Sequence, residues 1–336
     1  MIRFRIIIIL AIVLAAIIFL ITWLWPRRAD EVPEWVPTPK VEIKRYEKAL
    51  FYLDPSQLAV HFEELRTTYS PFYVDNQDDS VKIESLHRFV TDQNNRALFE
   101  AVIAKYPSLE WLSEEMAAAF RQLIYLFPDW TPPLVFAYVS GLYIEKPVLY
   151  NGEYLVIALD MFLGEGFELY LKSGIPMYLT SRMDNPYIVS TSIETILRHW
   201  LQTDVVFEHL LDRMITEGKI LYLLDRILPN TNDEFKIGYT AEEIYWCQKH
   251  ESNLWAYFIE NERLYVSDPL VVNRYTRDGP FTSAFGRESP ARTAIWIGWQ
   301  IVRRYMKNNP ETSVEKMLTL PSKQILHESG YKPGRF

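Results

Sequence analysis

The sequence has one cysteine, few glycines and no excess of positive charge. Cys247 is the only thiol among 336 residues, so no disulfide can form within the chain. The Gly164-Glu165-Gly166 stretch lacks both the spacing and the lysine of a phosphate-binding loop. The formal net charge is −8, and because residues 1–28 carry four arginines and no acid, the remainder carries −12. Such an acidic remainder argues against nucleic acid as a partner and against adhesion to anionic lipid.

No pair of histidines has the spacing of a zinc-peptidase helix. Such a helix carries His-Glu-x-x-His, in which two imidazoles four residues apart grip zinc and the glutamate polarises a metal-bound water. In the helical pattern TSIETILRHWL, Glu194 is present, but Ile193 and Leu197 stand where the histidines would be. Neither can bind a metal, and we expect His199 and His209 to be helix-surface or partly buried residues. The sequence therefore predicts no metal site, no cofactor and no catalytic residue.

The longest uncharged stretch covers residues 6–25. Its twenty residues, at about 1.5 Å each, would cover about 30 Å, the hydrocarbon core of a bilayer. Arg3 and Arg5 precede it and weakly favour a cytoplasmic N-terminus. No small-x-small cleavage site precedes Pro26, and no cysteine is available there for a lipid anchor. We expect an uncleaved N-terminal transmembrane helix in the inner membrane with a periplasmic domain, and a cleaved signal peptide is the alternative.

Four segments follow from the composition along the chain. Residues 1–28 form the membrane anchor, and residues 29–40 form a proline-rich linker, which is extended and semi-rigid. Residues 41–130 form a helical N-terminal subdomain that opens with a short strand at 41–44. Its amphipathic patterns predict helices over residues 57–69, 83–91, 94–106 and 109–127. Residues 131–336 form a β-hairpin region and a helical core.

At Pro132 the hydrophobic period changes from helical to strand-like. We expect three or four strands between residues 134 and 163, where valine, tyrosine, isoleucine and leucine are frequent. Asn151-Gly152 is typical of a two-residue hairpin turn. Asp160 ends the apolar run LVIALD, and we interpret it as an acid at the end of a strand near a turn, with a role in a site as the alternative.

The C-terminal part reads as a series of helices. Residues 171–187 are expected to be loop-like, and two helical patterns, TSIETILRHWL and HLLDRMITEGKILYLLDRIL, follow. Thr240 and the acids after it predict the start of a long helix. Ser289 as N-cap and Pro290 at the first helical position predict the start of the final long helix. We expect Gly298 inside that helix to allow close approach of a neighbour, because an exposed glycine there would cost about 1 kcal/mol.

Several stretches together resemble a known family. They are VEIKRYEKALFYLD, LVIALDMFLG, TEGKILYLLDRILP, KIGYT, WAYFIE, GPFTSAFGRESPAR and IGWQIVRRYM. The chain resembles the gliding-motility protein GldB family of the Bacteroidetes over residues 41–333. That family is similar in turn to predicted zinc metallopeptidases, in which His-Glu-x-x-His lies on one helix and Glu-Gly on the next. The resemblance implies a predominantly helical, zincin-like α+β domain with a small antiparallel or mixed sheet.

The resemblance also implies a cellular setting. The family is associated with gliding motility and the type IX secretion apparatus, so envelope proteins of that machinery are the expected partners. Many members carry a lipoprotein cysteine where this chain has an apolar span. A lipoprotein-like location at the outer membrane, as in those relatives, is therefore the alternative to the inner membrane.

The family pattern can be carried over residue by residue. Glu194 matches the catalytic glutamate loosely, and Glu217-Gly218 matches the third-ligand pair, so both glutamates are relic positions of a degenerate peptidase. The hairpin ending in LVIALD would be the sheet edge that pairs with a peptide in active relatives. The candidate partner-binding residues on it are Leu155, Ile157, Leu159 and Asp160.

Three functional hypotheses follow from these observations. The first is a catalytically inactive zincin-like module that binds envelope proteins. The second is a working metallohydrolase with atypical ligands such as Glu194, Glu217 and His199, although two residues five positions apart on a helix diverge too far to share one metal well. The third is a periplasmic peptide-binding protein that uses the sheet edge for strand addition.

Overall fold

A computed structural model of the chain describes residues 32–74, 77–201 and 207–334. The residues from Thr38 onward form one compact unit. The predicted membrane anchor, residues 1–28, lies outside the described residues. Within the described ranges, no helix is both long enough and apolar enough to span a bilayer. The predicted division at residues 130 and 131 stays a prediction.

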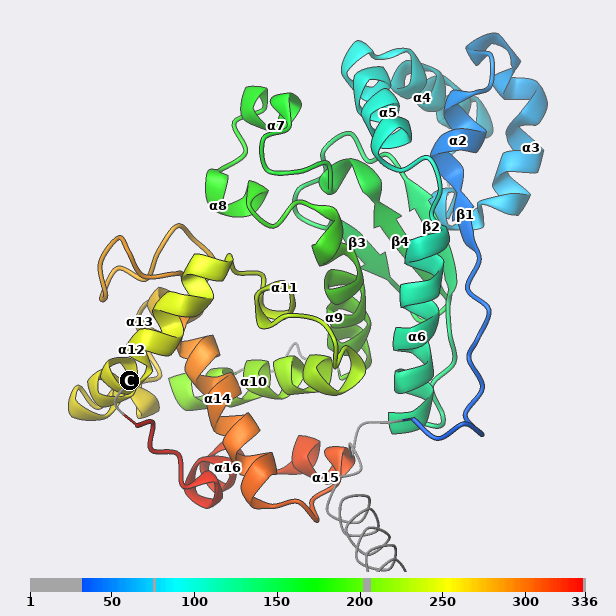
Figure 1. Cartoon of the computed structure of the whole chain (residues 1–336). Coiled ribbons are helices and arrows are strands. Elements are labelled where there is room, and N and C mark those ends of the chain that lie inside the picture. Colours follow the sequence, from blue (N-terminus) through cyan, green and yellow to red (C-terminus); the bar gives the residue numbers. More distant parts are fainter. Residues whose placement is uncertain (1–31, 75–76, 202–206, 335–336) are drawn as a thin grey trace, which may run out of the picture. The chain divides into compact units, whose positions relative to one another are not determined.

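The sheet is mixed, which is one of the two alternatives that the family resemblance implied. Its four strands among the described residues lie in the order β1-β2-β4-β3 (Figure 1). Their bounds are Ile43–Arg45 (β1), Leu134–Tyr138 (β2), Val148–Tyr150 (β3) and Tyr154–Ala158 (β4). Strand β2 runs parallel to both β1 and β4, whereas β3 runs antiparallel to β4. The middle residues of β2 and β4 form continuous buried apolar runs, which is typical of strands covered on both faces.

The hairpin between β3 and β4 forms at Asn151-Gly152, but its connection is longer than a two-residue turn. The register pairs Tyr150 with Leu155, which leaves residues 151–154 between them. The Asn151 side-chain oxygen accepts hydrogen bonds from the backbone N–H groups of Glu153 (3.1 Å) and Tyr154 (2.8 Å). Gly152 has a φ of 99°. The asparagine side chain therefore closes the turn over several residues, which corrects the predicted turn length.

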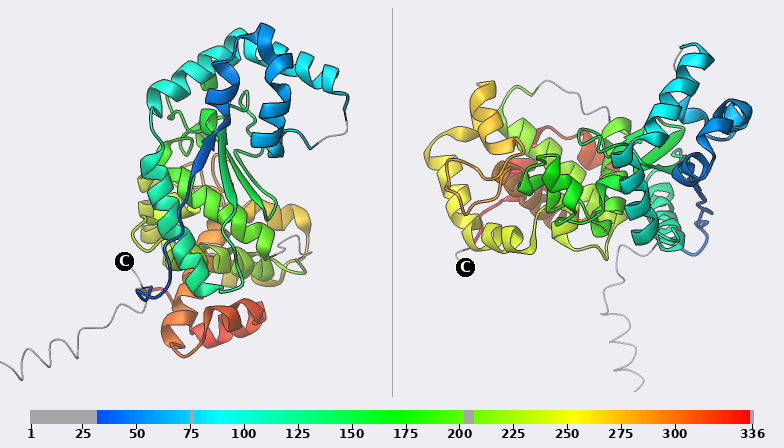
Figure 2. Two further views of the ribbon diagram at one scale, coloured as in Figure 1. Left: turned by 90° about the vertical axis from the view of Figure 1, so that its right-hand side faces the viewer. Right: turned by 90° about the horizontal axis from the view of Figure 1, so that it is seen from above.

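The helices that precede β2 agree with the predicted periodic patterns. They are α2 (Tyr46–Phe51), α3 (Leu58–Thr68), α4 (Asp79–Thr91), α5 (Gln93–Lys105) and α6 (Glu110–Leu126). Their buried residues, including Leu58, Phe120 and Val102, join a hydrophobic core that extends to the C-terminal helices. Figure 2 shows α2 to α5 gathered at one end of the sheet and the last helices of the chain at the other.

The part after β4 is almost entirely helical. Its helices are α7 (Glu168–Lys172), α8 (Met177–Thr180), α9 (Ile188–Trp200), α10 (Leu210–Ile227), α11 (Asp233–Ile237), α12 (Ala241–Glu260), α13 (Pro269–Thr276), α14 (Thr293–Asn308), α15 (Val314–Thr319) and α16 (Ser322–Ser329). Short 3₁₀ turns occur at Pro55–Gln57, Ser70–Phe72, Leu159–Met161, Asn185–Tyr187 and Arg263–Tyr265. The stretch 171–187, predicted to be loop-like, thus contains single helical turns. Thr240 caps α12 as predicted, because its hydroxyl accepts from Glu243 N–H and the Glu243 carboxylate accepts from Thr240 N–H.

The start of α14 differs from the prediction. The helix begins at Thr293, with Arg292 as its N-cap residue in the left-handed conformation (φ 56°). Ser289 instead donates its hydroxyl to the carbonyl oxygens of Thr282 (3.1 Å) and Gly286 (2.7 Å). The carbonyl of Pro290 accepts from Thr282. These bonds close the loop before the helix, so the Ser-Pro pair stabilises that loop and does not cap α14.

Helices α10 and α14 cross at two glycines. A Cβ atom placed on Gly298 would lie 1.9 Å from the carbonyl oxygen of Met214, and one on Gly218 would lie 2.5 Å from backbone atoms of Gly298. No side chain fits at either position. The predicted close approach at Gly298 is therefore confirmed. Helix packing also explains why residue 218, in the Glu217-Gly218 pair, is a glycine.

Candidate functional site

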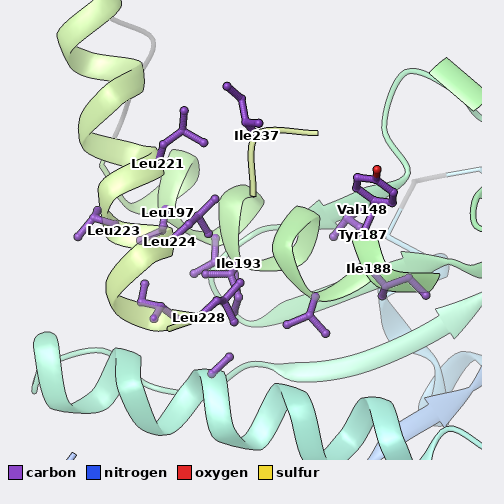
Figure 3. Packing of buried hydrophobic residues seen from close by; sticks show 14 of the residues in the cluster. Val148, Tyr187, Ile188, Ile193, Leu197, Leu221, Leu223, Leu224, Leu228 and Ile237 are labelled. Atoms are coloured by element: carbon purple, nitrogen blue, oxygen red, sulfur yellow. The ribbon is translucent and has the colours of Figure 1, made fainter. Parts of the chain in front are cut away.

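The buried face of α9 occupies the centre of the site region. Ile193 and Leu197, which stand where a zinc-peptidase helix would carry its histidines, are fully buried. Figure 3 shows both side chains among leucines of α10, including Leu224, and next to Leu228. Burying such a side chain contributes about 1.5–3 kcal/mol. The two positions therefore serve the hydrophobic core.

On another side of α9, two carboxylates share one guanidinium. Arg198 Nη2 lies 2.7 Å from Glu194 Oε1 and 2.5 Å from Glu217 Oε2. Arg198 Nε donates a further hydrogen bond to Glu194 Oε1 at 2.9 Å. Arg213 Nη2 lies 3.0 Å from Glu217 Oε1. We call Glu194, Arg198, Arg213 and Glu217 the Arg198 cluster.

The Arg198 cluster keeps its guanidinium charged. Burial lowers the pKa of Arg198, but the carboxylates of Glu194 and Glu217 more than offset this and raise it above its usual range. The Glu217 side chain is only 5% exposed, so it needs cationic partners. A fixed positive charge between two acids takes the electrostatic role that a divalent metal would have.

His199 does not join this cluster. It is exposed on α9, and its ring packs edge-on against that of Tyr150 on β3, with 5.1 Å between the ring centroids. Across residues 32–74, 77–201 and 207–334, no group of three His, Cys, Asp or Glu side chains is placed to hold a metal ion. Of the atypical ligand set, the structure thus brings Glu194 and Glu217 together through an arginine and leaves His199 apart.

The predicted partner-binding residues are buried. Leu155, Ile157 and Leu159 have no exposed surface, and neither has Asp160. The hairpin of β3 and β4 lies at one end of the sheet, but within it β4 is covered, because it pairs with β2 on one side and with β3 on the other. The edge strand of this hairpin is β3, whose Leu149 is 38% exposed.

Asp160 holds a turn. Its carboxylate accepts hydrogen bonds from the backbone N–H groups of Ser140 (2.8 Å) and Leu142 (2.9 Å) and from the Ser140 hydroxyl (2.9 Å). Burial raises its pKa, while these donors oppose the rise. Because Leu142 has a positive φ of 66°, the bonds to Asp160 stabilise a strained turn.

A pocket of about 310 Å³ opens beside α9. We call it the α9 pocket. Thr191 and Glu194 line it from α9, and Arg182, Asp278 and Arg292 line it from three other parts of the chain. Figure 1 shows α8, α9 and α11, from which other lining residues come. A pocket of this volume is at the lower end of the range for small-ligand sites.

The walls of the α9 pocket are fixed by hydrogen bonds between distant segments. The Tyr187 hydroxyl donates to the carbonyl of Tyr239 at 2.8 Å, and burial raises the pKa of Tyr187 to about 12. Lys236 Nζ lies 3.0 Å from Asp225 Oδ1. Sequence reasoning predicted Glu194 but missed Arg182, Asp278 and Arg292. Asp278 and Arg292 have one local signal, the concentration of charge in residues 277–292, and Arg182 lies outside that segment.

Comparison with known proteins identifies one family. The family model described as gliding motility protein GldB matches residues 28–333. No curated protein and no solved structure matches the chain. Because the match covers nearly the whole chain, this protein belongs to the gliding motility protein GldB family.

Proposed function

We propose that this chain is a non-catalytic, protein-binding component of the gliding motility apparatus, with a degenerate metallopeptidase domain. Family membership associates the chain with gliding motility. The observation that carries the rest is the Arg198 cluster, in which one guanidinium bonds both relic glutamates. A cation there opposes zinc binding, and Ile193 and Leu197 offer no ligand atoms.

The proposed setting is the cell envelope. The short name of the matching family model, GldB_lipo, indicates a lipoprotein-like envelope protein. Residues 1–28 offer an apolar span and no cysteine, so we propose a single-pass inner-membrane protein with its domain in the periplasm. Its partners would be envelope proteins of the gliding and type IX secretion machinery. A lipoprotein-like outer-membrane location is the alternative.

Strand addition is a second candidate mode of binding, and one observation favours it. Strand β3 pairs with β4 and lies at the end of the sheet in the described part of the chain. The α9 pocket opens near the loop that leads into β3, since Ile144, Glu145 and Pro147 line it. An extended segment of a partner could therefore pair with β3 and place a side chain in the pocket.

The test of the proposed function separates chemistry from binding. Cells that lack the protein are complemented with Glu194→Gln, which keeps the shape of the side chain and removes the base. We expect gliding to be retained at matched protein levels.

A photo-crosslinking residue at Ile144, beside the pocket, should give a discrete envelope adduct that the same residue at Val60, an exposed site on α3, does not give. Loss of gliding with a folded Glu194→Gln protein would contradict the proposal, as would identical adducts at both positions.

A further inference from the structure

Two arginines from separate parts of the chain converge on one carboxylate in the α9 pocket. Arg182, which follows α8, donates from Nη2 to Asp278 Oδ2. Arg292, at the start of α14, places Nε 3.5 Å from Asp278 Oδ1. The side chain of Asp278 is 38% exposed, whereas those of Arg182 and Arg292 are 26% and 18% exposed. The acid is thus the most accessible member of the three.

Arg292 is held in place by backbone carbonyl groups, and one of its N–H donors has no hydrogen-bond partner. Its Nη2 donates to the carbonyls of Ile237 (2.6 Å) and Gly238 (3.3 Å), and its guanidinium lies 5.4 Å from the Tyr239 ring centroid. Its Nε is buried and has no hydrogen-bond partner. A buried donor without a partner is costly, and a carboxylate oxygen closer than that of Asp278 would satisfy it.

The backbone at Gly238 passes beside both arginines. Gly238 has a φ of 70°, and a Cβ atom there would lie 3.5 Å from both Arg182 Cδ and Arg292 Nη2, which is ordinary van der Waals contact. A larger residue would be strained by this backbone conformation. Glycine at this position therefore allows the turn whose carbonyl groups accept from Arg292.

Two of the other charged groups of the pocket have ion-pair partners of their own, and several of its walls are apolar. Glu194 is bonded to Arg198, and Lys236 is paired with Asp225. Glu145 lines the pocket near its mouth loop. The apolar walls come from Phe162, Leu179, Met183 and Phe235. Two arginines beside these apolar walls, in a cavity of about 310 Å³, suit a carboxylate joined to an apolar side chain.

We propose that the α9 pocket binds the C-terminal carboxylate of a partner polypeptide that ends in an apolar residue. The inference rests on the proposed function and names the part of the partner that is recognised. In the ligand-free chain, Asp278 occupies the carboxylate position as a tethered competitor. It lies in the loop between α13 and α14, and the partner's carboxylate displaces it and takes its place between Arg182 and Arg292.

The test uses the purified full-length chain and a fluorescent peptide ending in Ala-Leu, measured by anisotropy. The free-acid peptide should bind at least about tenfold more tightly than the same peptide with a C-terminal amide. Asp278→Asn removes the competing charge and should tighten binding by about three- to tenfold. Arg182→Gln and Arg292→Gln should weaken it by at least about tenfold. Asp79→Asn and Arg66→Gln are matched controls, because Asp79 lies 3.5 Å from Arg66 in a pair on other helices, and both should leave binding unchanged.

Each outcome of the peptide-binding test either supports the proposal or overturns it. Because Arg292 also bonds backbone carbonyls, its variant can fail to fold; the Arg182 and Asp278 variants, checked by circular dichroism, then carry the test. Equal binding of acid and amide, or no binding of the acid by either wild type or Asp278→Asn, overturns the proposal. Binding of octanoate without binding of the peptide overturns the assignment to a chain end. Retention of the Ile144 adduct in cells despite these results would leave the proposed function standing and reject this inference alone.

Discussion

At the scale of single residues, Glu217 is a buried acid that forms ion pairs with two arginines. Its two carboxylate oxygens contact Arg198 and Arg213. Both oxygens are therefore engaged by guanidinium groups in a position that is almost fully buried. Removing the acid would leave two cations facing a partly desolvated space, and this sets the expected cost of each substitution.

We expect Glu217→Gln to fold and to support gliding, with a loss of about 1–3 kcal/mol in the free energy of unfolding, because an acceptor remains. Glu217→Leu should cost about 3 kcal/mol or more, because both arginines lose their acceptor. Urea unfolding measures the stability and a motility assay measures the function. Glu63→Gln is the matched control: its pair with Arg66 is exposed, and its loss should cost roughly 0–1 kcal/mol. A folded Glu217→Gln protein that cannot support gliding would point to a chemical role.

At the scale of secondary-structure elements, α10 and α14 cross with their backbones in contact at Gly218 and Gly298. Gly298→Ala would place a methyl group on the carbonyl of Met214, so the two helices must separate. We expect a loss of about 3 kcal/mol or more, at the upper end of overpacking effects, because backbone atoms cannot rotate away.

The control for this substitution is Gly166→Ala, since a Cβ atom there meets nothing within 4 Å. Thermal unfolding followed by circular dichroism compares the two variants with the wild type. Equal melting temperatures for Gly298→Ala and Gly166→Ala would show that the helices do not cross as closely as described.

Elements defined by local signals could be predicted from the sequence. The reciprocal bonds of Thr240 and Glu243 involve neighbours, so the start of α12 was predictable, as were the periodic helices before β2. The place of β4 inside the sheet was not, because it depends on parallel pairing with β2, which no local pattern encodes. The start of α14 was misplaced since loop hydrogen bonds of Ser289 outweigh its capping tendency.

The residues of the candidate site likewise include some that could be predicted from the sequence and some that could not. Glu194, Glu217 and Gly218 could be singled out because the resemblance to the family matches them to its motif on two consecutive helices. Arg182 and Asp278 are 96 residues apart in sequence, and only the folded chain brings them to one pocket. The bonding of Arg198 to the carboxylates of both Glu194 and Glu217 depends on how α9 and α10 pack, and no local pattern encodes it.

At the scale of the whole molecule, we propose that an N-terminal anchor and a partner-binding domain have separate roles. Residues 1–28 are predicted to hold the protein at the membrane and to take no part in recognition. Replacing them by an unrelated span of the same orientation should therefore preserve gliding, whereas a cleavable signal should weaken it by releasing the domain. Motility assays and the mature N-terminus found in cells provide the readouts. Full activity of the released domain, or a mature N-terminus near Arg27, would contradict the anchor.

The central claim is that a guanidinium, and no metal, neutralises Glu194 and Glu217. Elemental analysis of the purified chain, combined with melting in the presence and absence of a chelator, tests it most directly. The account predicts no stoichiometric zinc and an unchanged melting temperature. A zinc ion that holds a fold together can contribute roughly 10 kcal/mol or more, so about one zinc per chain with a large loss of stability on chelation would contradict the account.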